Sequence, residues 1–214
     1  MGERTFGFFS GFPDRRFPRE IAERLKAALG DRESLVFVSA WPSDHEQNDA
    51  DSDGMHAMFV EWGLGFKHHC VIDDRTDAQT AVELIRGADC VFFMGGHPEL
   101  QFELIQKLGI DKAIRDSDST VLGVSAGSIN MAKRSLDTKE SLVPYDGMGL
   151  ADVTIKPHFE PANKQVLADL LQVSAELPIH ATTDNSAIFV HGGEVEYFGE
   201  IYLVENGEIT PVSE

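Results

Sequence analysis

The segment Thr120-Val-Leu-Gly-Val-Ser-Ala-Gly-Ser-Ile-Asn130, or TVLGVSAGSIN, joins an apolar run to a serine between two glycines. Its first half, TVLGV, is typical of a buried parallel strand, and SINMAKR after it fits the first turns of a helix. Between them lies Gly-x-Ser-x-Gly with Ser125 at its centre, the pattern of a nucleophile elbow. A tight turn with a helix-capping serine has the same pattern, so the motif alone leaves both interpretations open.

Outside this motif, short apolar runs alternate with amphipathic stretches along the chain. The alternation predicts strands at 5–9, 34–39, 66–72, 89–94 and 120–124, and helices at 18–29, near 55–62, at 76–86 and at 99–115. Strands and helices that alternate in this way are typical of an α/β protein with a mostly parallel sheet and helices on both faces.

After Ser135 the pattern changes to short strands around one predicted helix at 163–173. These strands are expected near 155 and at 178–181, 187–190, 195–198 and 201–204. Asn206-Gly207 between apolar residues predicts a C-terminal β-hairpin. Because the sequence contains no repeat, low-complexity segment or linker, we expect residues 1–214 to form one domain.

The composition is that of a globular protein with a strong negative charge. With 214 residues, 42% of them hydrophobic, the chain can bury a core without disulfides or a metal ion. Its formal net charge of −18 repels nucleic acid and anionic membranes, and an acidic substrate would need a local cation. The N-terminus lacks the basic and apolar regions of a signal peptide, and no apolar run reaches the length of a membrane span. We therefore expect a soluble, cytoplasmic protein that binds neither nucleic acid nor membrane.

An acidic segment, Asp49-Ala-Asp-Ser-Asp-Gly54, matches the first half of a calcium-binding loop. Such a loop needs a bidentate carboxylate at its twelfth position, which here is Val60. The sequence therefore favours a solvated acidic loop, with Asp53 as a candidate cap for the helix that follows.

A second glycine turn, Gly95-Gly96, follows the strand predicted just before that of Ser125. Neighbouring parallel strands bring their carboxyl-end loops to the same edge of a sheet. A backbone N–H of this turn could therefore join the N–H of Ala126 in an oxyanion hole. His97, the next residue, is expected to contact substrate at this edge.

The candidate general base is His158, in the segment Lys156-Pro-His-Phe159. It follows a short predicted strand and lies in a loop with a proline on either side, Pro157 and Pro161. Among the eight histidines it is the one best placed to reach the edge of the sheet where Ser125 is expected.

These residues resemble a known family: GVSAGS after an apolar strand, with a Gly-Gly turn before it and Pro-His-Phe after it, is similar to the aspartyl dipeptidase (peptidase E) and cyanophycinase family of serine peptidases. The resemblance extends from the first strand through Phe189. It implies a three-layer α/β/α sandwich, flavodoxin-like and related to class I glutamine amidotransferases. It also implies Ser125 as nucleophile, His158 as base and the N–H groups of Gly96 and Ala126 as oxyanion donors, with no metal or organic cofactor.

The third member of the implied triad has three candidates. Glu140 is favoured because the family places an acid at about that offset after the serine, and Asp137 lies slightly earlier. Glu160 corresponds to the position used in related amidotransferases. Each could also be an ordinary exposed carboxylate. Whichever acts should be partly buried against His158, since its task is to hold the imidazole tautomer and stabilise the imidazolium.

The sequence departs from the family pattern on the substrate side. The usual turn Gly-Gly-Gly-Asn is replaced by Gly95-Gly96-His97-Pro98. Selectivity for an N-terminal aspartate needs a cation after the histidine, and the corresponding segment offers only Lys164, a poorer match to a carboxylate than arginine.

The sequence thus predicts a serine peptidase that hydrolyses short, dipeptide-like substrates through a covalent acyl-enzyme, with an N-terminal acidic residue as one possible preference. His97 and Lys164 are the candidate substrate-binding residues, and we expect a monomer or homodimer. Two alternatives stay open: an esterase of α/β-hydrolase type, and a small-molecule binding relative that has kept the elbow without turnover.

Overall fold

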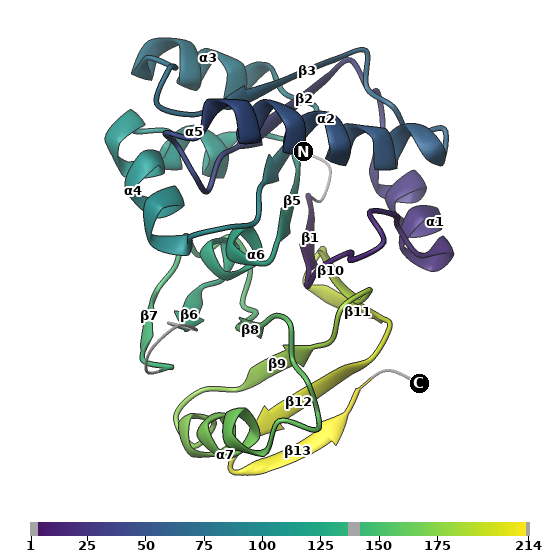
Figure 1. Cartoon of the computed structure of the whole chain (residues 1–214), viewed down its shortest axis with the longest axis vertical. Helices are drawn as coiled ribbons and strands as arrows, with labels where there is room; N and C mark the ends of the chain where they lie inside the picture. Colours follow the sequence, from purple (N-terminus) through teal and green to yellow (C-terminus); the bar gives the residue numbers. More distant parts are fainter. Residues whose placement is uncertain (1–3, 137–141, 213–214) are drawn as a thin grey trace.

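The computed structural model of the chain describes residues 4–136 and 142–212. Its centre is a seven-stranded sheet with the strand order β11-β10-β1-β5-β4-β2-β3 (Figure 1). The five strands from β1 to β3 in this order run parallel, and β10 and β11 are antiparallel to them. These strands are β1 (Thr5–Phe9), β2 (Ser34–Val38), β3 (His68–Ile72), β4 (Cys90–Phe93), β5 (Thr120–Val124), β10 (Ala187–His191) and β11 (Glu194–Phe198).

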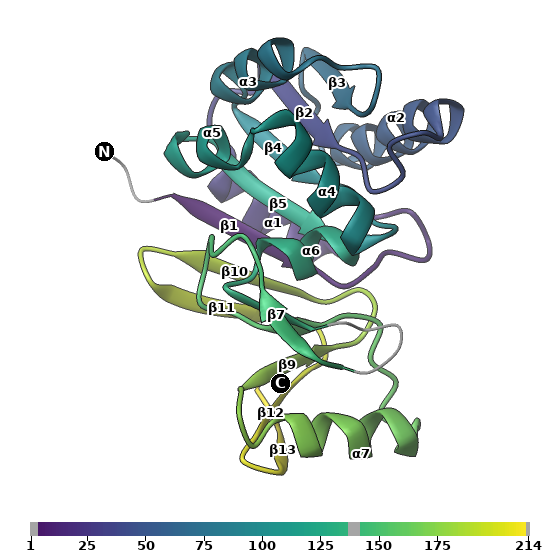
Figure 2. The ribbon, with the colours of Figure 1, turned by 90° about the vertical axis from the view of Figure 1, so that its left-hand side faces the viewer.

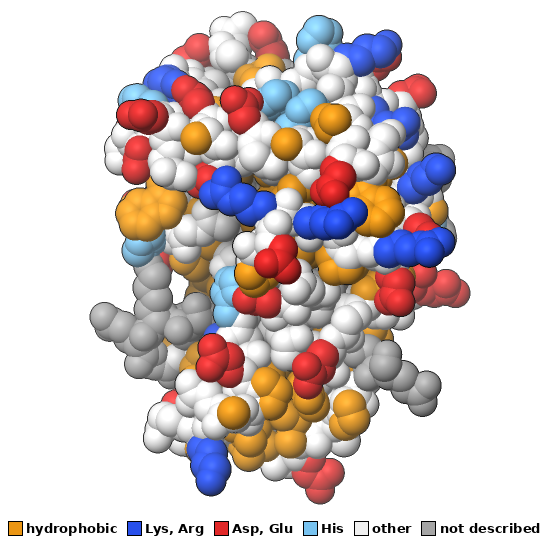
Figure 3. Space-filling view, turned by 45° about the vertical axis from the view of Figure 1, so that its right-hand side comes forward, with side chains coloured by type: hydrophobic (Ala, Val, Ile, Leu, Met, Phe, Trp, Pro, Cys, Tyr) orange, Lys and Arg blue, Asp and Glu red, His pale blue; other side chains and the backbone are white. Residues whose placement is uncertain are grey.

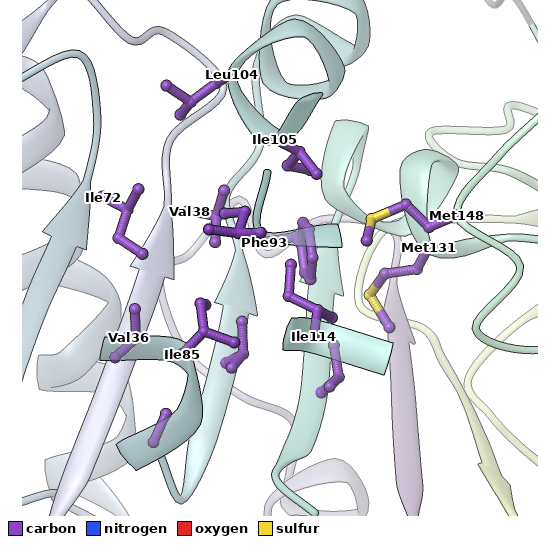
Figure 4. Packing of buried hydrophobic residues seen from close by; sticks show 14 of the residues in the cluster. Val36, Val38, Ile72, Ile85, Phe93, Leu104, Ile105, Ile114, Met131 and Met148 are labelled. Carbon is purple, nitrogen blue, oxygen red and sulfur yellow. The ribbon is translucent and has the colours of Figure 1, made fainter. Parts of the chain in front are cut away.

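Helices cover both faces of this sheet, which confirms the α/β sandwich expected from the sequence (Figure 2). One face carries α1 (Arg19–Ala28) and α2 (His45–Glu61), whose buried side chains pack on Phe9, Phe37 and Phe92. The other face carries α3 (Ala78–Gly87), α4 (Pro98–Leu108), α5 (Asp111–Asp116) and α6 (Ala126–Met131). Figure 4 shows this second core, where Val38 and Phe93 from the sheet meet Ile105 and Met131 from the helices.

Neighbouring residues of a strand face opposite layers, as the two-residue period of a strand requires. In β4, Val91 and Phe93 enter one core and Cys90 and Phe92 enter the other. Side chains on both faces of β4 and β5 are buried, which explains why the sequences of these strands are nearly continuous apolar runs.

A four-stranded sheet in the order β13-β12-β9-β8 lies beyond the large one. It consists of β8 (Ile155–Lys156), β9 (Ile179–Thr182), β12 (Ile201–Glu205) and β13 (Glu208–Pro211), and α7 (Lys164–Val173) packs on it. The β12–β13 pair turns at Asn206-Gly207, so the predicted C-terminal hairpin is confirmed. A short pair, β6 (Arg134–Leu136) and β7 (Pro144–Asp146), follows α6.

Two features of the helical layer differ from the sequence prediction. The acidic segment at 49–54 is part of α2, which begins at His45 after the cap Asp44, so the expected solvated loop and the capping role of Asp53 were wrong. Polar residues on the inner face of α2, Asn48 and Ser52, are buried and hydrogen-bonded, and they interrupt the apolar pattern that would have revealed the helix. The helix expected at 99–115 is two helices, because Gly109 ends α4 in a left-handed conformation with φ +63°.

The surface mixes charges of both signs. Figure 3 shows Asp and Glu side chains interspersed with Lys and Arg on one face, and hydrophobic side chains gathered at its lower end, over the four-stranded sheet. Among the helices of the described residues, none is long and apolar enough to cross a membrane.

Candidate active site

Ser125 lies at the turn between β5 and α6, at the carboxyl edge of the parallel strands. Its backbone has φ +51° and ψ −111°, a conformation that non-glycine residues rarely adopt. The turn is held by the Ser125 N–H, which donates to the carbonyl oxygen of Phe9 at 2.9 Å. The structure thus contains the strained strand–turn–helix predicted from Gly-x-Ser-x-Gly.

The two glycines of the motif are needed because other backbone approaches them closely. A Cβ on Gly127 would lie 2.2 Å from the Phe93 carbonyl oxygen, and one on Gly123 would lie 2.8 Å from the Gly127 carbonyl carbon. Ser128 then fixes α6 to the sheet, since its hydroxyl donates to the Phe9 carbonyl and accepts from the Phe9 N–H at 2.9 Å. This packing sets the position of the Ser125 side chain relative to β1 and β4.

His158 follows β8 in the loop that enters α7, and it also has a left-handed backbone, with φ +53°. Its N–H donates to the Ser10 hydroxyl at 2.8 Å, and that hydroxyl donates in turn to the carbonyl of Thr182 at 3.0 Å. The imidazole Nε2 lies 2.9 Å from Ser125 Oγ, although 33 residues separate the two in the chain. The structure therefore brings the predicted nucleophile and base into hydrogen-bonding contact.

The other imidazole nitrogen of His158, Nδ1, lies 2.7 Å from Oδ1 of Asp184. Asp184 follows β9 in the turn Thr182-Thr183-Asp184-Asn185, at the same edge of the molecule as Ser125. With Nδ1–H donating to the carboxylate, Nε2 is left to accept the Ser125 hydroxyl proton. Asp184 thus occupies the place of a triad acid, and the sequence analysis missed it.

Glycine at position 11 makes room for this pair. A Cβ on Gly11 would lie 2.6 Å from His158 Cε1 and 2.6 Å from Asp184 Oδ1. The Gly11 carbonyl also accepts from the Asn185 N–H at 2.8 Å, which ties the β1–α1 loop to the turn that carries Asp184.

The three acids named from the sequence have different outcomes. Glu140 and Asp137 lie outside the described residues. Glu160 is exposed, and both nitrogens of the His158 ring already have other partners. Asp184 is also exposed, with 39% of its side chain accessible, but its Oδ1 lies 2.7 Å from His158 Nδ1, the contact that a triad acid makes.

The segments that carry the predicted oxyanion donors adjoin Ser125. A Cβ on Gly95 would be 3.6 Å from Ser125 Cβ, so the Gly95-Gly96 turn adjoins the serine. Gly96 has φ +141° and lies under Trp41, where a side chain would meet the indole at 2.6 Å. Ala126 is the first residue of α6, whose N–H has no acceptor within the helix.

The two predicted substrate-binding residues lie in different settings. His97 is the cap residue before α4, and its ring meets that of Trp41 edge-on at 4.0 Å, so it stands next to the Gly96 turn. Lys164 is exposed at the start of α7, the helix that packs on the four-stranded sheet. Lys156, just before Pro157, is a second cation near the histidine loop, and burial lowers the pKa of its ammonium group while Glu160 opposes this effect.

The acidic segment 49–54 has a helical backbone, which rules out the coordinating turn of a calcium loop. Among the described residues, His45, Asp73 and Asp74 do bring ligand atoms within 4.8 Å of one another. Arg75 already binds the buried Asp73 carboxylate there at 2.7 Å, so the cluster is an ion-pair network.

The chain matches solved structures over almost its whole length. A peptidase from an acI-B1 Actinobacterium has a TM-score of 0.72 and 15% identity, covering 99% of this chain and 95% of its own. A candidate peptidase E protein from Listeria monocytogenes EGD-e has a TM-score of 0.66 and 18% identity, covering 92% of this chain and 98% of its own. At these identities the likeness establishes the fold. No curated protein matches the chain.

The model of peptidase family S51 matches residues 9–198, which include the elbow, the histidine loop and the turn of Asp184. This match confirms the resemblance to the peptidase E family drawn from the sequence. The chain belongs to peptidase family S51, a family of serine peptidases, and is a serine-type peptidase.

Proposed function

We propose that this enzyme hydrolyses short peptides through an acyl-enzyme formed on Ser125. The observation that carries the proposal is the continuous chain of contacts Ser125 Oγ–His158 Nε2 at 2.9 Å and His158 Nδ1–Asp184 Oδ1 at 2.7 Å. An alcohol, an imidazole and a carboxylate in this order are the components of a catalytic triad, in which the imidazole activates the alcohol as a nucleophile.

In the acylation step, His158 Nε2 takes the hydroxyl proton as Ser125 Oγ attacks the scissile carbonyl carbon. Asp184 accepts the Nδ1–H bond throughout and stabilises the imidazolium that forms. The N–H groups of Gly96 and Ala126 are proposed to hold the oxyanion, each contributing on the order of 3 kcal/mol to the transition state. His158 then gives its proton to the leaving amine, and the C–N bond breaks.

Deacylation repeats these steps with water as the nucleophile. His158 Nε2 takes a proton from the water, which attacks the ester carbonyl, and the proton returns to Ser125 Oγ as the acid product leaves. The chain's own residues supply every proton transfer in this scheme.

The substrate is proposed to be a short peptide, because the nucleophile stands between close loops: the Gly96 turn with Trp41 on one side and the Gly11 loop with His158 on the other. The monomer or homodimer state and the cytoplasmic location remain predictions from the sequence.

Labelling with a fluorophosphonate followed by a dipeptide and ester panel tests the proposal. We expect the wild-type protein to be labelled at Ser125 and to hydrolyse dipeptides, and Ser125→Ala to lose both properties. Ser43→Ala, at an exposed serine, is the matched control. Absence of labelling in the wild type would favour a binding protein, and turnover of esters alone would favour an esterase.

A further inference from the structure

Beside Ser125 there is an apolar pocket with a cavity volume of about 290 Å³. Its walls come from three regions of the chain: the loop after β1, one face of α2, and the ends of β4 and β5. Six apolar side chains line it: Phe12, Met55, Met58, Phe92, Met94 and Val124. We refer to it below as the apolar pocket.

We propose that the apolar pocket binds the side chain of the substrate residue that supplies the scissile carbonyl, and that the enzyme therefore prefers an unbranched or γ-branched apolar residue, such as Met or Leu, at that position. The inference rests on the proposed function, because it assigns a substrate class to the same serine.

The apolar pocket adjoins the nucleophile directly. Val124, one of its lining residues, precedes Ser125 in the chain, and Gly95, another, lies against the Ser125 side chain. A substrate carbonyl bound at Ser125 therefore lies next to the apolar pocket.

The position of His158 decides which part of the substrate enters. Gly11 and Asp184, which contact the imidazole, place it on the β1 side of Ser125. The apolar pocket extends from Phe12, in the loop after β1, to Phe92 and Met94 at the end of β4, and its lining among the described residues includes neither His158 nor Asp184. Because the imidazole must protonate the leaving amine, the leaving group lies toward His158 and the acyl residue toward the apolar pocket.

The residues of α2 that face the apolar pocket explain why there is space for it. Asp51, Gly54, Met55 and Met58 recur at helical spacing and so share one face of α2. Gly54 leaves this face open, since a Cβ there would first meet Arg15 Nη1, at 3.2 Å. A large side chain at Gly54 would therefore fill the mouth of the pocket.

The chemistry of the lining favours an apolar side chain over a carboxylate. Among the described residues of the lining, the cation is Arg15, which is 72% exposed and lies 3.5 Å from Asp51, so that its charge is offset at the rim. Methionine side chains such as Met55 and Met58 adapt to apolar groups of different shape. A substrate carboxylate in the apolar pocket would lose its hydration, and no ion pair of its own would compensate for the free energy lost.

The test compares the dipeptides Met-Ala, Leu-Ala, Ala-Ala and Asp-Ala with the wild type, Gly54→Leu and Ala57→Leu. Ala57 is an exposed residue of the same helix and gives a control with the same added side chain. We expect kcat/KM for Met-Ala to exceed that for Ala-Ala by at least about tenfold in the wild type, the scale at which hydrophobic pockets discriminate. Gly54→Leu should lower kcat/KM for Met-Ala much more than for Ala-Ala and so remove this preference, and Ala57→Leu should retain it.

Each other outcome has a defined meaning. If the wild type hydrolyses Ala-Ala as well as Met-Ala, or if Gly54→Leu lowers both equally while fluorophosphonate labelling persists, the inference is overturned and the proposed function stands. If Asp-Ala is the best substrate and Arg15→Ala removes that preference, Arg15 binds the carboxylate of the substrate and the proposed preference for an apolar side chain is wrong. If no peptide is cleaved and Ser125 is not labelled, the proposed function itself fails.

Discussion

His158 Nδ1 lies 2.7 Å from Asp184 Oδ1, across 26 residues of chain that include the whole of α7. The contact is possible because β8 and β9 are parallel neighbours, with Lys156 opposite Ala181 in the register, so the loops after both strands leave the same edge. The acid that we propose for the triad, Asp184, therefore follows the histidine in the chain, whereas the favoured candidate from the sequence, Glu140, precedes it.

The first prediction concerns this acid. Asp184→Asn should lower kcat on the order of 10³- to 10⁴-fold, because an amide no longer fixes the imidazole tautomer or stabilises the imidazolium. Steady-state kinetics on the best dipeptide, with circular dichroism to verify folding, measures the effect. Glu140→Gln and Glu160→Gln are the comparison variants, and a larger loss in either of them than in Asp184→Asn would place the triad acid there.

The second prediction concerns the space beside the pair. Gly11→Ala should lower kcat/KM about 10²-fold, because the added methyl displaces the imidazole and the Asp184 carboxylate from the productive geometry. Gly30→Ala is the control, since a Cβ at Gly30 meets no atom of the described residues within 4 Å. Unchanged kinetics in Gly11→Ala would mean that the His158–Asp184 contact can shift without loss of activity.

The third prediction separates folding from chemistry at the elbow. In Gly127→Ala, the added Cβ would stand 2.2 Å from the Phe93 carbonyl oxygen, so α6 must move away from β4. Such overpacking costs about 3 kcal/mol, or a fall in Tm of roughly 6–12 °C for a chain of this size. Thermal unfolding measures it against Gly87→Ala, where a Cβ meets none of the residues that the structure describes within 4 Å and Tm should not fall. Equal Tm values for the two variants would contradict the close approach.

Much of this architecture could be predicted from the sequence, because local signals and burial agree in the parallel sheet. The bounds expected for β1 and β5 match the structure, since both strands are short apolar runs covered on both sides. Ser125 and His158 could be identified from the sequence for the same reason, because each lies just after a strand whose carboxyl end could be located.

Asp184 could not be identified from the sequence in this way. Thr-Thr-Asp-Asn reads as an ordinary polar turn, and its chemistry depends on the pairing of β8 with β9, which no local pattern reveals. The one available signal was that this turn also follows a predicted strand of the same half of the chain. The beginning of α2 could not be predicted for a different reason. Its buried Asn48 forms hydrogen bonds with Ser39 and the Trp41 carbonyl, so the inner face of the helix is polar there and lacks the apolar periodicity that indicates a helix.

The last prediction concerns pH and the junction of the two sheets. His180 on β9 contacts the Tyr197 hydroxyl of β11 at 3.0 Å and the Thr154 carbonyl at 3.3 Å. Burial lowers the pKa of the His180 imidazole, and the hydrogen bond that the ring donates to the Thr154 carbonyl opposes this shift. The folded protein therefore binds a proton at this site less readily than the unfolded chain, whose histidines titrate near pH 6.5.

The sign follows from linkage: the contribution of neutral His180 is fully present above the unfolded pKa and is lost as pH falls below it. Burial also lowers the pKa of His56, with the nearby His69 adding to the effect, so the wild-type protein should lose stability between pH 7.5 and pH 5.5 through both histidines. His180→Gln cannot titrate there and should show a smaller loss over the same interval, measured as the difference in the free energy of urea unfolding at the two pH values. Equal losses in the wild type and His180→Gln would show that His180 takes up no extra proton on unfolding.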